Sequence, residues 1–171
     1  MKYLILTVTI LICQLCYAQK FPASFTGHWQ GELTWYKQNS KAPQKVKMQL
    51  IIQPSDTTGQ FTWQLIYGEN NKDNRPYLLK PVDTAKGHWI VDERNGILLD
   101  HFWVANRLMA SFTVGKSTIV NSFRIDGDNL IAEFYSIGAV PVRASGGNDK
   151  DTPMVNSYPV GGYQYAVLRR G

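Results

Sequence analysis

Three histidines are the side chains of this sequence best suited to metal binding or acid-base chemistry. They are His28, His88 and His101, and the acidic side chains that could join them are Asp92, Asp100 and Glu133. None of them has the H-E-x-x-H spacing by which two histidines on one helix bind zinc. The sequence therefore predicts no metal site.

His101 has the most suggestive surroundings, because it lies within the apolar segment Leu99-Asp100-His101-Phe102-Trp103. A histidine in an apolar setting can ligate haem iron or transfer a proton. Asp100 cannot assist it directly, because successive side chains of a strand point to opposite faces. A histidine without a chemical role is the alternative interpretation.

The first eighteen residues resemble a secretory signal peptide, in which Lys2 precedes an apolar run that extends to Ile12 and the segment ends at Ala18. The apolar run is shorter than the roughly 20 residues that a bilayer-spanning helix needs. Both cysteines, Cys13 and Cys16, belong to this segment. We expect an exported protein, periplasmic or secreted, without stable membrane insertion and without disulfides once residues 1–18 are removed.

The composition indicates one domain over residues 19–171. The chain has 171 residues, of which 44% are hydrophobic and 18% charged, enough apolar material for a single core. Its net charge of +5 is spread along the chain, and its densest basic cluster is only a pair, Arg169-Arg170 at the C-terminus. Nucleic-acid binders usually combine a basic stripe with stacking aromatic residues, so we expect no nucleic-acid partner.

Apolar and polar residues alternate with a period of two along most of the chain, which predicts an all-β protein. In one example, Val46, Met48, Leu50 and Ile52 alternate with polar residues. The predicted strands are 25–36, 46–52, 61–67, 75–82, 87–93, 97–105, 107–114, 117–126, 129–137 and 162–170. Short turns between them favour a single up-and-down antiparallel β-barrel of about 8 to 10 strands, because closure removes the strand edges.

The segment 138–161 interrupts this regular pattern. Its central residues 144–153 are rich in glycine, aspartate and other turn-forming types. We expect no regular strand there, but a long mobile loop before the last strand. Such a loop either covers the mouth of a cavity or is disordered.

The residues Phe25-Thr26-Gly27-His28-Trp29 resemble the F-x-G-x-W signature that opens the first strand of lipocalins and related calycins. In that superfamily the tryptophan lies at the closed end of the barrel and an arginine of the last strand packs on its indole. The resemblance implies a contact between Trp29 and Arg169, with Gly27 leaving room beside the ring. The Thr-Asp-Tyr stretch of the kernel lipocalins is absent, which indicates an outlying, lipocalin-like calycin closer to the fatty-acid-binding or nitrobindin type.

The resemblance implies a cup that holds a small hydrophobic molecule without catalysis and without a cofactor. Aromatic residues on strands are the candidate lining, with plain core packing as the alternative: Trp63, Tyr67, Trp103, Phe112 and Phe134. Fatty-acid-binding relatives hold a carboxylate with an arginine and a tyrosine. Arg124 is the candidate for that role, unless it faces solvent on the outside.

Two other functions remain open. In the first, His101 binds haem or performs the chemistry of a small-molecule enzyme, as a nitrobindin-type resemblance would permit. In the second, the barrel is filled with side chains and acts as a protein-interaction module through its outer face. The second function would be marked by the absence of a cavity.

Overall fold

The computed structural model describes residues 21–171, so the predicted signal peptide lies outside the described residues. Ten strands form the main sheet. They are β1(Gly27–Lys37), β2(Gln44–Ile52), β3(Phe61–Tyr67), β4(Asp73–Asp83), β5(His88–Asp92), β6(Leu98–Val104), β7(Arg107–Val114), β8(Ser117–Asp126), β9(Asn129–Gly138) and β12(Val160–Arg170). Three short 3-10 helices are η1(Ala23–Phe25), η2(Glu69–Asn71) and η3(Thr84–Lys86). No helix within residues 21–171 has the length and apolar character needed to cross a membrane.

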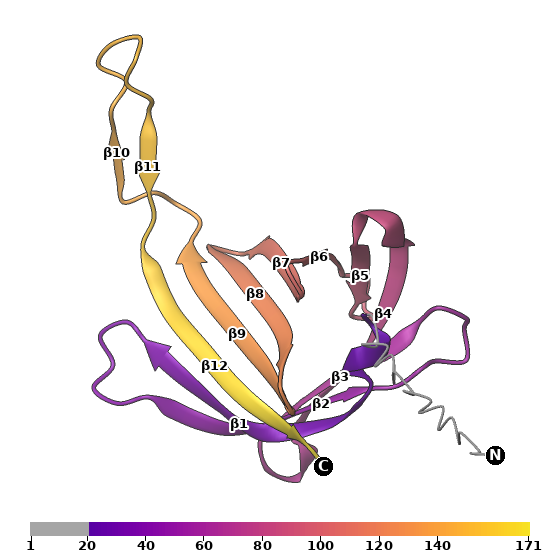
Figure 1. Ribbon diagram of the computed structural model, residues 1–171. Coiled ribbons are helices and arrows are strands. Elements are labelled where there is room, and N and C mark those ends of the chain that lie inside the picture. Colours follow the sequence, from indigo (N-terminus) through magenta and orange to yellow (C-terminus); the bar gives the residue numbers. More distant parts are fainter. Residues whose placement is uncertain (1–20) are drawn as a thin grey trace, which may run out of the picture.

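The strands close into a barrel in which every neighbouring pair is antiparallel (Figure 1). Consecutive strands pair with each other from β1 to β9, then β12 follows β9, and β12 closes the ring against β1. The closing register sets Trp29 opposite Arg170 and Trp35 opposite Gln164. The prediction of an all-β, up-and-down antiparallel barrel is therefore confirmed.

The alternation of strand direction sorts the loops between the two ends of the barrel. One end carries the chain start of β1, the end of β12 and the turns 53–60, 84–87, 105–106 and 127–128. The other end carries the turns 38–43, 68–72, 93–97 and 115–116 together with the long connection 139–159. We call these the closed end and the open end, because the core fills the first and a cavity occupies the second.

Large apolar side chains pack the closed end. Phe25 and Trp29 are each 1% exposed, and the Trp29 indole Nε1 donates a hydrogen bond of 2.8 Å to the Phe25 carbonyl. Phe21 stacks on Trp103 with ring centroids 4.5 Å apart, and this pair covers the closed end of the barrel. Further buried side chains from around the ring complete this core: Met48, Leu50, Ile52, Leu79, Trp89, Leu108, Leu130 and Leu168.

The arginine that packs on Trp29 is Arg170, so the predicted contact with Arg169 is wrong. The Arg170 guanidinium lies over the indole at 4.4 Å, and its Nη1 donates a hydrogen bond of 2.7 Å to the Thr26 carbonyl. The register explains the one-residue difference, because Arg170 lies opposite Trp29 on the inward side whereas Arg169 lies opposite Gln30. A Cβ at Gly27 would come within 2.9 Å of Arg170 Nη1, so the glycine leaves room for this contact.

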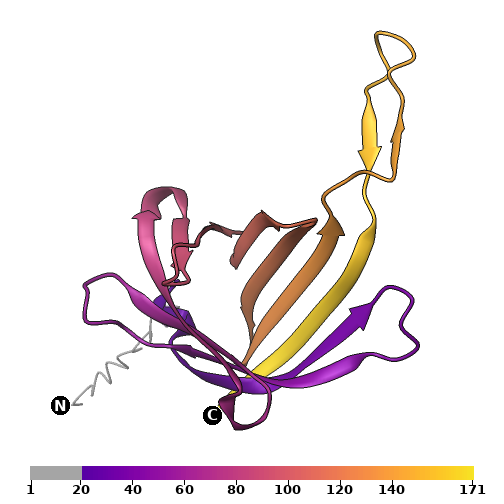
Figure 2. The same ribbon diagram turned by 180° about the vertical axis from the view of Figure 1, so that it is seen from behind.

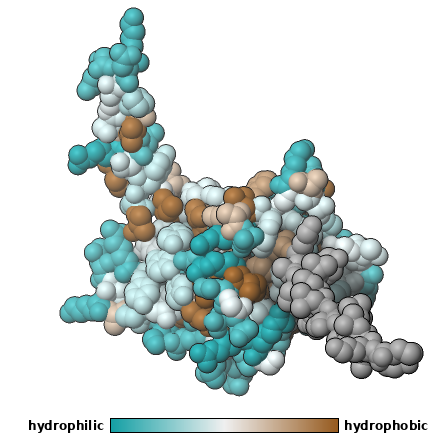
Figure 3. Space-filling view, in the orientation of Figure 1, coloured by the Kyte–Doolittle hydropathy of each residue, from teal (hydrophilic) through white to brown (hydrophobic). Residues whose placement is uncertain are grey.

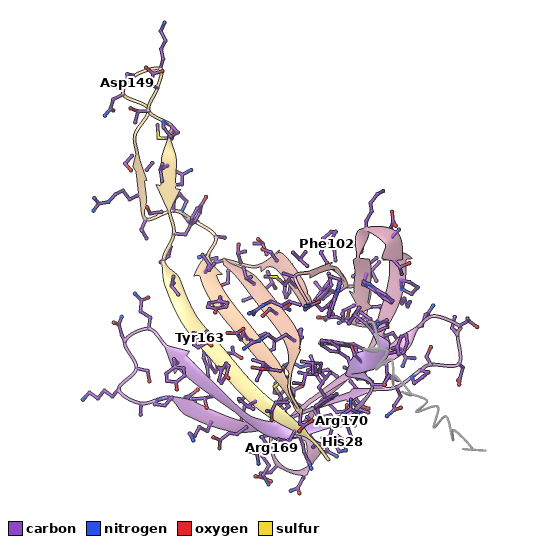
Figure 4. The ribbon with its side chains drawn as sticks, in the orientation of Figure 1. His28, Phe102, Asp149, Tyr163, Arg169 and Arg170 are labelled. Carbon is purple, nitrogen blue, oxygen red and sulfur yellow. The ribbon has the colours of Figure 1, made fainter. Side chains whose placement is uncertain are left out.

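The segment 138–161 contains two strands, contrary to the expected irregular loop. β10(Arg143–Ser145) and β11(Val155–Ser157) pair as an antiparallel hairpin. The hairpin projects from the barrel as an arm, with Asp149 at its tip (Figures 1, 2 and 4). Local hydrogen bonds form it, such as that from the Val142 amide to the Ser157 carbonyl, and these were not visible in the composition of 144–153.

Candidate functional site

A cavity of about 910 Å³ opens into the barrel from the open end. Its floor is a pair of aromatic rings from strands on opposite sides of the ring, Trp63 on β3 and Phe123 on β8. The two rings meet edge to face with centroids 5.0 Å apart. The lower half of the barrel is thus packed with side chains, whereas the upper half encloses space of the size of a small-molecule site.

Four of the five aromatic residues predicted to line a cup do so: Trp63, Tyr67, Phe112 and Phe134. Each lies on the inward face of its strand, and aliphatic residues fill the positions between them, including Leu33, Val46, Leu65, Val91, Leu99 and Ile119. Trp103 differs, because it packs against Phe21 and Phe25 at the closed end. The walls of the cavity are therefore mostly apolar.

Arg124 faces the outside of the barrel, so its predicted place inside the cup is wrong. The inward side chains of β8 include Asn121 and Phe123, and the alternation sends Arg124 outward. There its Nη1 donates a hydrogen bond of 3.0 Å to Glu133 Oε2. Arg107 contacts the same carboxylate oxygen at 3.2 Å, so Glu133 holds two arginines of neighbouring strands.

The cation that does reach the cavity is Arg75, at the start of β4. It is already paired, because Nε and Nη2 donate hydrogen bonds of 3.0 and 2.6 Å to the two carboxylate oxygens of Asp73. Its guanidinium also lies over the Tyr67 ring at 4.9 Å. Glu93 lines the same part of the wall, so the charged groups at the mouth do not leave a free positive charge.

Two tyrosines adjoin this charged group. Burial raises the pKa of Tyr67 to about 12, although the nearby Arg75 acts in the opposite direction. Burial, together with the Glu93 carboxylate, also raises the pKa of Tyr77. Both phenols are therefore neutral hydrogen-bonding groups at neutral pH.

The sequence analysis did not weigh Arg75 as a cavity residue, although the predicted strand 75–82 contains it. β4 begins two residues earlier, and its register sets Arg75 opposite Leu65 and Tyr77 opposite Trp63, all of them lining the cavity. The alternation of Arg75, Tyr77 and Leu79 was visible in the sequence. Because Leu79 is apolar, that alternation would have indicated Arg75 as an inward arginine.

His101 lies inside the barrel, as expected for an apolar setting, and is 2% exposed. Its Nδ1 lies 3.0 Å from the Leu99 carbonyl oxygen, to which it donates a hydrogen bond in the neutral ring. Burial lowers the pKa of His101, although the Leu99 carbonyl and Asp100 act in the opposite direction. Asp100 itself faces outward and contacts the His88 ring at 2.7 Å, so the two neighbours do point to opposite faces.

Asn121 is a second buried polar residue of the cavity wall, and the sequence analysis did not name it. It is 6% exposed and its side chain adjoins the His101 imidazole. Ala110 lies opposite Asn121 on the intervening strand β7, and its small side chain lets the two polar groups meet. His101 and Asn121 stand just above the floor, two residues along their strands from Trp103 and Phe123.

The described residues hold no group of three or more histidine, cysteine, aspartate or glutamate side chains placed to bind a metal ion. The cavity instead combines apolar walls with polar groups at two levels, the mouth and the floor. Such an arrangement orients a bound molecule through a few polar contacts while apolar walls provide most of the contact area.

Comparison with known proteins supports the fold alone. No protein-family model matches the chain, and no curated protein matches it. A solved structure that is similar is that of a protein of unknown function from the DUF3598 family of Nostoc punctiforme. The match has a TM-score of 0.57 at 11% sequence identity, and it covers 86% of this chain but 48% of that protein. This chain therefore spans about half the length of that relative.

These findings define the class of protein as a closed, ten-stranded antiparallel β-barrel with a structural neighbour in the DUF3598 family. Its architecture is consistent with a calycin-like barrel, including a tryptophan and an arginine in contact at the closed end.

Proposed function

We propose that this protein binds a small hydrophobic molecule in the open half of its barrel. The observation that carries the proposal is the cavity of about 910 Å³ above the Trp63–Phe123 floor. Its apolar walls offer a favourable transfer of roughly 25 cal/mol for each Å² of apolar ligand surface removed from water. A barrel whose only task was stability would gain by filling this space with side chains.

A matched pair of tryptophan substitutions tests the proposal. Leu99→Trp adds volume to the cavity wall, whereas Ser111→Trp adds the same side chain on the exposed outer face of β7. We expect an apolar fluorescent dye to bind the wild type and the Ser111→Trp variant alike, and to bind Leu99→Trp at least tenfold more weakly. Equal binding to all three proteins would show that the dye does not use the cavity, and would overturn the proposal.

Export of the protein is part of this proposal. It is supported by the basic residue, apolar run and small-residue end of the first eighteen residues. Expression with the complete N-terminus in a secreting bacterial host, followed by intact-mass measurement, tests it. We expect the mature chain to begin at Gln19, and an uncleaved cytoplasmic product would contradict the export.

Haem binding through His101 is a second candidate function, because one specific observation favours it. The Nδ1 hydrogen bond to the Leu99 carbonyl resembles the outer contact that fixes a metal-ligating histidine and leaves Nε2 for the iron. The Asn121 amide that adjoins the ring would have to turn aside. Titration with haemin distinguishes this candidate: it requires a Soret band that the wild type develops and that a His101→Phe variant does not.

The third candidate is a filled barrel that acts through its outer face, and it requires a packed interior. The open half of this barrel contains a cavity instead. We do not propose that function.

A further inference from the structure

The floor of the cavity contains a hydrogen-bond acceptor that the described protein does not satisfy. Within residues 21–171, Asn121 Oδ1 is the one buried side-chain oxygen or nitrogen without a hydrogen-bond partner. Asn121 is itself 94% buried, because its exposed fraction is 6%, and it lines the cavity. An unsatisfied buried acceptor is costly, which calls for a different orientation of the amide group.

The hydrogen bonds of His101 fix which way the amide must turn. A neutral imidazole has one N–H group, and the bond from Nδ1 to the Leu99 carbonyl uses it. The Asn121 amide adjoins the ring. Because Nε2 of the neutral ring is an acceptor, the amide meets it favourably with its NH₂ group and not with its oxygen. The two orientations of an amide differ only by exchange of the oxygen and nitrogen. With NH₂ toward His101, the NH₂ group takes the buried place in which Oδ1 had no partner, and Oδ1 takes the other amide position of this cavity-lining side chain, where a donor in the cavity can reach it.

The charges around the cavity determine what kind of donor fits. His101 is neutral at the floor, and Arg75, the one lysine or arginine among the lining residues, is held by both oxygens of Asp73. A ligand carboxylate would therefore find no free cation at either level. It would also meet the Glu93 carboxylate at the mouth and the unpaired Asn121 oxygen at the floor.

We propose that the ligand is an apolar molecule with an uncharged hydrogen-bond donor, of the class of a long-chain or alicyclic alcohol, and that Asn121 Oδ1 accepts its hydrogen bond at the floor. This inference rests on the proposed function, since it assigns the ligand class of the same cavity. The apolar body lies against the aromatic and aliphatic walls above Trp63 and Phe123. The donor replaces the hydrogen bond that the protein leaves unmade.

Three probes with the same alkyl chain test the ligand class by calorimetry: dodecanol, dodecyl methyl ether and dodecanoate. The ether keeps the oxygen but has no O–H donor, and the acid carries a charge at neutral pH. We expect the alcohol to bind the wild type about tenfold more tightly than the ether, because one buried hydrogen bond is worth about that factor. We expect the acid to bind more weakly than the alcohol by at least the same factor.

A matched pair of amide replacements then locates the donor's partner. Asn121→Leu removes the acceptor at the floor, whereas Gln164→Leu makes the same kind of change at a cavity-lining position of β12 opposite Trp35. The preference for alcohol over ether is expected to disappear in Asn121→Leu and to persist in Gln164→Leu. Ether binding serves as the control for folding, because it requires the cavity but no donor.

The outcomes separate the two proposals. If none of the three probes binds the wild type, the proposed function fails. If the ether binds as tightly as the alcohol, or the acid binds more tightly than both, the cavity binds apolar molecules but the inference on ligand class is wrong. Since that comparison uses the wild type alone, it holds even where Asn121→Leu does not fold.

Discussion

At the scale of single residues, the two C-terminal arginines of β12 make different contacts although they are adjacent in sequence. Figure 4 shows both at the end of the last strand. Arg170 turns inward over Trp29 and binds the Thr26 carbonyl, which joins the end of the chain to its described beginning. Arg169 turns outward and is exposed. Both side chains are exposed, so one residue of register separates an arginine that packs on Trp29 from one that does not.

Replacing these arginines in turn measures that difference. Arg170→Ala removes the cation–π contact and a hydrogen bond to backbone, so we expect it to lower the free energy of unfolding by about 1 kcal/mol. Arg169→Ala is the matched control and should change it by less than about 0.5 kcal/mol. Urea denaturation of the two variants checks this, and a larger loss for Arg169→Ala would refute the assigned contact.

The buried His101 makes stability depend on pH. Burial lowers its pKa in the folded protein below the ordinary value of 6.5, so the unfolded chain binds a proton first as the pH falls. The free energy of unfolding should therefore decrease as the pH is lowered through 6.5. At higher pH the ring is neutral in both the folded and the unfolded chain, and this destabilisation by His101 is absent. Asp73 and Asp92, whose pKa values are lowered by Arg75 and Lys80, lose their contribution only at more acidic pH.

Urea midpoints of the wild type and a His101→Gln variant at neutral and mildly acidic pH check this dependence. The wild type should lose stability over that interval, and the variant should lose clearly less. Parallel curves for the two proteins would show that His101 is not the titrating group.

At the scale of the strands, Glu133 links the outer surfaces of several neighbours. Its carboxylate on β9 accepts hydrogen bonds from Arg107 on β7 at 3.2 Å, from Arg124 on β8 at 3.0 Å and from the Tyr163 hydroxyl on β12 at 3.2 Å. The side chain is 16% exposed, so these contacts are better shielded from water than ordinary surface pairs. Glu133 therefore reinforces the part of the barrel wall that carries Asn121.

A neutral replacement tests this link. Glu133→Gln should lower the free energy of unfolding by about 1 kcal/mol, and added salt should reduce the difference because charges partly open to solvent are screened. Glu32→Gln is the matched control, since Glu32 pairs with Lys45 in a bridge whose side chains are 52% and 60% exposed. Equal effects of the two substitutions would contradict a special role of Glu133.

The arm is an element that the barrel does not need for closure, because β9 and β12 pair with each other directly. Hydrophobic surface gathers around its base (Figure 3), where Val140, Val142 and Val160 are exposed.

Replacing residues 139–159 with a two-residue Asn-Gly turn should leave the unfolding midpoint nearly unchanged. Dye affinity should change by less than about twofold. A clear loss of affinity would show that the arm acts as a lid.

At the scale of the whole molecule, the sequence predicts the barrel better than its interior. Alternation and short turns predicted ten strands, with the bounds of β7 and β8 matching the structure, because strand formation depends on local patterns. The site depends on inward faces, and those follow from register. Arg124 and Arg169 were placed incorrectly for that reason, whereas Trp103 faces inward but packs at the closed end. Asn121 gave no signal, because an asparagine in a strand stands out only once its burial is known.

The central claim is that the upper half of the barrel holds one small apolar molecule. Native mass spectrometry of the purified mature protein, before and after incubation with an apolar lipid extract, tests it most directly. The account predicts a mass excess of one ligand per chain that disappears on denaturation and that solvent extraction recovers as an uncharged, donor-bearing apolar compound. A bare protein mass under both conditions would contradict it.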